Sequence, residues 1–180
     1  MVATEKAQGG ILTKPNQPNI PKYFSYKLAH DQIKRAIESN PPFPIEAIAI
    51  EESILFDRLR SAVLALVPKK ASTKSFSKIF EAVYDKQTHT ATHGFEGLGA
   101  ALTKKGGFEA LDNWRKGRNR FIHGLARSVE PGQPTEIGSD VFYVEGLFVA
   151  REGLALVRIV ESWSQKNIRA AKKASSKNKA

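Results

Sequence analysis

The sequence predicts an all-α protein, a bundle of four to five helices joined by short loops. In several segments apolar residues recur at three- and four-residue intervals, which is the spacing of one helix face. Prolines and glycines fall between these segments, and no alternating apolar and polar series indicates a strand. A length of 180 residues suits one compact domain with tails.

The chain divides into three predicted parts. Residues 1–22 contain Pro15, Pro18, Pro21 and a Gly-Gly pair, which break helices and strands, so we expect a flexible N-terminal arm. Residues 23–169 carry the helical patterns and form the predicted domain. Residues 170–180 form a basic tail of lysine, alanine, serine and asparagine.

The apolar pattern predicts five helices within the domain. The second helix is the clearest, because Pro44 suits its first turn and Pro68 stops it. We expect residues 141–144 to be briefly extended and residues 130–139 to form a Pro/Gly loop. The predicted helices cover about 23–39, 44–67, 75–86, 108–127 and 146–169, with one or two further turns over 98–105.

The composition narrows the possible chemistry. There are no cysteines, so disulfides, thiolate metal sites and cysteine nucleophiles are excluded. The longest apolar run, residues 62–67, is too short to span a bilayer, and the polar start lacks a signal-peptide core. We therefore expect a soluble, cytoplasmic protein that does not enter a membrane.

The net charge of +10 is concentrated in two places. Residues 165–180 contain six bases and no acid, and residues 104–127 contain seven bases against two acids. Such clusters attract polyanions, nucleic acid first, although a solvated, solubilising surface is the simpler interpretation of the tail alone. On the second cluster the candidate nucleic-acid-binding residues are Arg115, Lys116, Arg120 and Arg127.

Common catalytic and metal-binding signatures are absent from the sequence, including the phosphate-binding loop and His-Glu-x-x-His. His89 and His93 are four residues apart, but the threonines around them argue against a shared helix face and no nearby carboxylate completes a metal site. We expect no cofactor and no metal.

Two charged residues lie within apolar helix faces. Arg118 falls in the same arc as Leu111 and Trp114, and Glu52 falls in the arc of Ile48 and Leu55. A buried arginine keeps its charge, so it must meet an acid or a phosphate. We predict that Glu52 pairs with Arg118, unless the helices are rotated and both charges reach water.

His123 follows Arg118 by five residues, about 140° around a helix, and Asn119 precedes it by one turn on its own side. The Asn119 amide could therefore orient the imidazole, with Lys116, Arg120 and Arg127 around it. This arrangement suits an imidazole that transfers protons at a phosphodiester. A histidine that only caps the helix end before Gly124 is the alternative.

The segment Arg118-Asn119-x-x-x-His123-Gly124, preceded by Trp114 and Arg115, resembles the motif of HEPN domains, which is an Arg followed after four to six residues by a His. The resemblance implies a metal-independent endoribonuclease, commonly a homodimer with both motifs in one cleft, and such domains often act as toxins or antiphage effectors.

Carried onto this chain, the resemblance makes His123 the acid and base, Arg118 the residue that holds the scissile phosphate, and Asn119 the residue that orients the histidine. Glu52 matches the family only loosely and joins the candidate site as the partner of Arg118. Any antitoxin or regulatory chain would be a separate polypeptide, because no partner nucleotidyltransferase domain is recognisable here.

Two other classes of function remain open at this point. One is a non-catalytic HEPN-like module that binds RNA or another protein, and the other is a basic protein that binds nucleic acid through its tail. The presence of Arg118, Asn119 and His123 together favours the enzyme.

Overall fold

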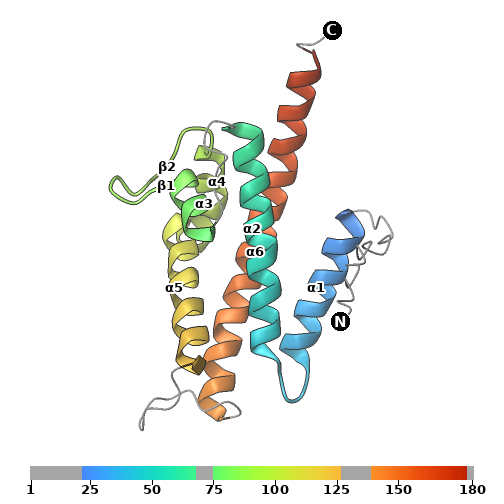
Figure 1. Cartoon of the computed structure of the whole chain (residues 1–180), viewed down its shortest axis with the longest axis vertical. Helices are drawn as coiled ribbons and strands as arrows, with labels where there is room; N and C mark the ends of the chain where they lie inside the picture. Colours follow the sequence, from blue (N-terminus) through green and yellow to red (C-terminus); the bar gives the residue numbers. More distant parts are fainter. Residues whose placement is uncertain (1–21, 68–74, 127–138, 178–180) are drawn as a thin grey trace, which may run out of the picture.

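The computed structural model describes residues 22–67, 75–126 and 139–177, and these residues form an all-α bundle, as predicted (Figure 1). Six α-helices are found in the described ranges, one more than the upper number expected, because the turns predicted over 98–105 form a separate short helix and a 3-10 turn. The predicted N-terminal arm up to residue 21, the 130–139 loop up to residue 138, and Arg127 lie outside the described residues. Lys22, predicted as the last residue of the arm, begins the first helix.

Helices α1 (Lys22–Glu38) and α2 (Pro44–Leu66) form an antiparallel pair. Pro44 occupies the first turn of α2, where its missing N–H costs no helical hydrogen bond. Ile48, Leu55 and Leu59 of α2 are fully or almost fully buried, so this helix lies at the centre of the core.

Five short elements connect α2 to the next long helix of the described chain, which begins at Gly107. Helix α3 (Phe76–Val83) begins at Ser75, whose hydroxyl accepts a hydrogen bond from the Lys78 N–H at 3.3 Å. Strands β1 (Tyr84–Asp85) and β2 (Thr90–Ala91) form a small antiparallel hairpin. Helix α4 (Glu96–Leu102) and the 3-10 turn η2 (Thr103–Lys105) then lead to Gly106, whose φ of 95° suits a glycine.

Helices α5 (Gly107–Ala126) and α6 (Asp140–Lys177) complete the bundle. Helix α6 runs beside α2 along much of the length of the molecule, with α1 on one side and α5 on the other (Figure 1). Leu156, Val157 and Val160 of α6 are buried in the core. None of the helices in the described ranges combines the length and apolar character that a bilayer crossing requires.

The structure corrects both ends of the last predicted helix. Residues 141–144 are helical rather than extended, because Ser139 starts the helix: its hydroxyl accepts from the Phe142 N–H at 3.2 Å and its carbonyl from the Tyr143 N–H at 3.1 Å. At the other end α6 continues past residue 169 to Lys177, through most of the predicted tail. Alanine and lysine favour helix, and neither glycine nor proline interrupts this stretch.

Candidate functional site

An ion pair joins the middle of α5 to α2 at the centre of the candidate site. Nη2 of Arg118 contacts Oε1 of Glu52, and Nη1 of Arg118 donates a hydrogen bond to Oδ1 of Asn119 at 2.5 Å. The side chains of Arg118 and Glu52 are 17% and 33% exposed. The predicted pairing of Glu52 with Arg118 is therefore confirmed, and the guanidinium is held in one orientation.

The burial of Arg118 makes it depend on its partners. Its Nε atom is buried and has no hydrogen-bond partner among the described residues, and burial lowers the pKa of the guanidinium. Arginine nevertheless stays charged at any physiological pH. A second anion, such as a phosphate, would therefore be favoured wherever it could reach the remaining N–H groups.

Among the described residues, the most buried carboxyl group belongs to Glu51, the residue before Glu52. Glu51 is fully buried, neither of its oxygens has a hydrogen-bond partner among the described residues, and burial raises its pKa to about 9. Glu52 lies at the edge of the buried face instead of inside it, which corrects the sequence prediction. The sequence signal was ambiguous, because both residues fall near the apolar arc of one helix and only the packing of α6 shows which one is covered.

The structure does not bring Asn119 and His123 into a hydrogen bond. Asn119 is engaged with Arg118, and His123 is exposed with no hydrogen bond to any described residue. The predicted role of Asn119 in orienting His123 is therefore wrong for this arrangement of one chain. The physical reason is that the adjacent buried guanidinium is a strong donor and takes the amide oxygen.

Asp112, one of the two acids counted in the basic cluster, neutralises part of it through contacts that sequence reasoning missed. Its carboxylate lies 2.8 Å from Nη2 of Arg115 and 2.8 Å from Nζ of Lys116. These contacts help to lower the pKa of Asp112 against the opposing effect of its burial. The spacings of three and four residues along α5 were the available signal.

Of the four predicted nucleic-acid-binding residues, Arg115 and Lys116 are thus paired with an acid. Arg120 is exposed and has no ion pair within the described part of the chain, and Arg127 lies outside it. Arg120 lines a groove of about 210 Å³ between α5 and α6, together with Gly117, Val144 and Phe148.

The two histidines of the hairpin region are not brought together as a metal site. Nδ1 of His89 lies 3.3 Å from Oε1 of Glu109, and Nδ1 of His93 lies 3.5 Å from Oε1 of Glu96. Among the described residues there is no group of three or more histidine, aspartate or glutamate side chains that could hold a metal ion.

Comparison with known proteins finds no matching family model, no similar curated protein and no similar solved structure.

Proposed function

We propose that this protein is a metal-independent endoribonuclease of the HEPN type, in which the ribose 2′-hydroxyl attacks the adjacent phosphodiester. The observation that supports the proposal is the contrast within α5: Arg118 is fixed in a shielded position by Glu52 and Asn119, whereas His123 is exposed and free to meet a substrate. A fixed cation and an exposed proton acceptor are the two groups that phosphodiester transfer needs.

Each residue has a separate task in this mechanism. His123 takes the proton of the 2′-hydroxyl or gives one to the leaving 5′-oxygen. Arg118 stabilises the charge that develops on the phosphate, using the N–H groups that Glu52 and Asn119 leave available. Glu52 and Asn119 position the guanidinium. Because the nucleophile belongs to the substrate, the reaction needs no metal-bound water.

The spacing of the two main residues favours a site shared by two chains. Five residues along a helix separate Arg118 and His123 by about 7.5 Å along its axis and about 140° around it. One copy would have difficulty presenting both groups to one phosphate. In a dimer, Arg118 of one copy and His123 of the other can contact the same phosphate without coming from the same helix. The proposal therefore includes a homodimer with a composite cleft.

The proposal extends to a cytoplasmic protein that acts as a toxin or antiphage effector. Any antitoxin or regulatory chain would be a separate partner.

A second candidate is a non-catalytic HEPN-like module that binds RNA or protein. One observation favours it: the two terminal nitrogens of Arg118 are already engaged, one by Glu52 and the other by Asn119. In such a module Arg118 would stabilise the helix pair and would not contact a phosphate.

An RNA cleavage assay in excess chelator separates these candidates. We expect wild-type protein to cleave mixed cellular RNA and to leave 2′,3′-cyclic phosphate ends, while DNA stays intact. His123→Ala should abolish cleavage. His93→Ala is the matched control, because His93 is also exposed and lies on another element, and it should cleave like wild type.

Two results would overturn the enzyme. The first is RNA binding by pure wild-type protein without any cleavage, which is the behaviour of the non-catalytic module. The second is equal loss of activity in the His123→Ala and His93→Ala variants, which would show that the activity does not depend specifically on His123 of the motif.

A further inference from the structure

One face of α6 points away from the bundle along the whole helix. At 100° per residue, its exposed side chains between Val141 and Arg169 fall within an arc of about 100°, and Lys173 lies in the same arc. The face begins with three exposed apolar residues: Val141 is 45% exposed, and Val144 and Phe148 are each 68% exposed. It continues with five exposed bases, which are Arg151, Arg158, Lys166, Arg169 and Lys173.

The charges on this face are available for a partner. None of the side chains of these five bases forms an ion pair or hydrogen bond within the described part of the chain, and no acid lies in the arc between Val141 and Lys173. Glu145 and Glu152 flank the arc and are partly buried. On α5, by contrast, Asp112 already holds Arg115 and Lys116.

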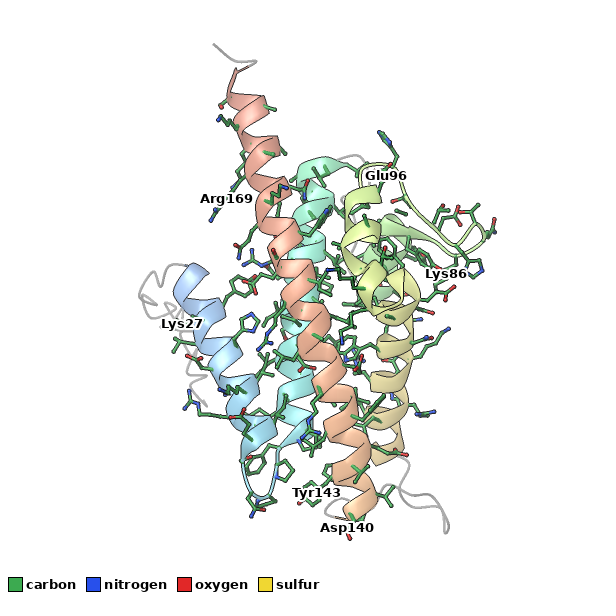
Figure 2. The ribbon with its side chains drawn as sticks, turned by 180° about the vertical axis from the view of Figure 1, so that it is seen from behind. Lys27, Lys86, Glu96, Asp140, Tyr143 and Arg169 are labelled. Atoms are coloured by element: carbon green, nitrogen blue, oxygen red, sulfur yellow. The ribbon has the colours of Figure 1, made fainter. Side chains whose placement is uncertain are left out.

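The basic part of the face is also sterically accessible. Arg169 lies near the C-terminal end of α6, and the turns that follow it extend beyond the other helices in both views (Figure 1 and Figure 2). At the apolar end of the face, Phe148 lines the groove of about 210 Å³ together with Arg120 and Gly117 of α5. Gly117 is the residue before Arg118. The face therefore runs from the neighbourhood of the candidate site to the far end of the molecule.

We infer that this outer face of α6 binds single-stranded RNA, with Phe148 stacking on a base and the five bases following the phosphates. The inference deepens the proposed function and rests on it for the class of substrate. An exposed aromatic ring beside a row of unpaired cations is the combination used for single strands, because every unpaired base offers a flat face. From Phe148 to Lys173 the row spans about 37 Å of helix.

The arrangement of the face favours RNA over two other occupants. A helix that lies on a membrane needs exposed apolar side chains along its length. Here the exposed apolar side chains of the face are confined to its first turns, and apart from Ser162 the exposed residues from Arg151 to Lys173 in this arc are basic. A second copy of the chain packed along the whole face would place like charges together without a matching acid.

Binding is best measured in the His123→Ala protein, so that RNA is not consumed, with a single strand of roughly 16 nucleotides, the upper end of the range for single-strand-binding modules. Phe148→Ala should weaken binding by about five- to a hundredfold, the effect of one lost stacking contact. Leu28→Ala is its control, because Leu28 is 54% exposed on α1, and it should leave the affinity unchanged.

The charges are tested by replacing Arg158, Lys166 and Arg169 together with glutamine. The affinity should fall and the slope of log K against log salt should become shallower by about 2, since each lost contact to a single strand contributes about 0.7. The control replaces the exposed Lys27, Lys34 and Lys78, which removes the same charge from α1 and α3.

Each of the following results would overturn the inference: equal effects of the two triple variants, duplex RNA that binds as tightly as the single strand, binding to phosphatidylserine vesicles but not to RNA, or a Phe148→Ala variant that changes only the oligomeric state in sedimentation. Cleavage of RNA by the protein with His123 unchanged is measured in parallel. Tight, Phe148-dependent binding without cleavage would contradict the proposed ribonuclease activity and support the RNA-binding face.

Discussion

At the level of single residues, the Arg118 and Glu52 pair connects stability with the candidate chemistry. Glu52→Ala leaves a shielded guanidinium without its anion. It should lower the free energy of unfolding by about 2 kcal/mol, less than the 3–5 kcal/mol typical of fully buried pairs because Glu52 is one-third exposed. Glu38→Ala, which removes an exposed pair with Lys34 on α1, should cost under about 0.5 kcal/mol.

A double variant separates the two roles of Arg118. Glu52→Leu combined with Arg118→Met lets the apolar faces close without ions, so much of the stability should return while RNA cleavage stays absent. Chemical denaturation and the cleavage assay measure the two outcomes. A Glu52→Ala protein as stable as wild type would show that the pair carries no stability, and normal cleavage by the double variant would remove Arg118 from the site.

Glu51 predicts a pH dependence of a different kind. Its pKa of about 9 in the folded protein lies far above the ordinary value of 4.5 that it regains on unfolding. The unfolded chain therefore binds fewer protons between these pH values, so the stabilising contribution of the neutral acid is complete below about pH 4.5 and is lost as the pH rises through 9.

Glu51→Gln keeps the shape and removes the titration. The variant should match wild type in thermal stability near pH 5 and become progressively more stable than wild type toward pH 9. Glu46→Gln, on an exposed position of the same helix, is the control and should follow the wild-type profile. Parallel pH profiles for Glu51→Gln and wild type would contradict the neutral buried acid.

At the level of elements, the contact between α2 and α6 depends on a glycine. A Cβ atom at Gly153 of α6 would overlap the Glu51 carboxyl group and lie 2.6 Å from Nε1 of Trp114, whose N–H donates to the Val149 carbonyl at 3.0 Å. Gly153→Ala should therefore destabilise the fold by roughly 1–3 kcal/mol, because the overpacking outweighs the gain in helix propensity.

Gly117 of α5 provides the matched control. A Cβ atom there would meet Val149 at 3.8 Å, an ordinary contact, so Gly117→Ala should gain up to about 1 kcal/mol from helix propensity. Denaturation of both variants measures the difference. Equal effects of the two substitutions would show that Gly153 is not constrained by Glu51 and Trp114.

The same elements show what the sequence could and could not predict. Apolar periodicity placed α1, α2 and α5 correctly, because each buries one face against neighbours. It extended α3 too far, since Tyr84 and Asp85 form β1 and not the end of a helix reaching residue 86. The apolar pattern failed at the start of α6, where the N-terminal cap at Ser139 decides where the helix begins. It also failed at the basic end of α6, where the helix propensity of alanine and lysine extends the helix although the residues are polar.

At the candidate site the sequence predicted the Arg118 and Glu52 pair, since an uncancelled charge in an apolar face requires a partner. The sequence could not show that Glu51 is buried more deeply than Glu52. This difference depends on the space above Gly153 of α6, about 100 residues away along the chain.

At the scale of the whole molecule, α6 connects the candidate site on α2 and α5 with the proposed RNA-binding face. Helix α6 packs beside α2 and α5 on its buried side, and its outer face carries the residues proposed to bind single-stranded RNA (Figure 2). Activity on this account requires two copies of the chain, because the fixed cation and the exposed imidazole of one α5 point in different directions.

Mixing two inactive variants tests this central claim most directly. One protein carries His123→Ala, the other carries Arg118→Met with Glu52→Leu, and each alone should fail to cleave RNA in chelator. After the chains exchange, half of the dimers are mixed and each mixed dimer holds one intact composite site, so about a quarter of the wild-type cleavage should return. A mixture as inactive as its components, under conditions where wild type cleaves and the chains are shown to exchange, would contradict a site shared between two chains.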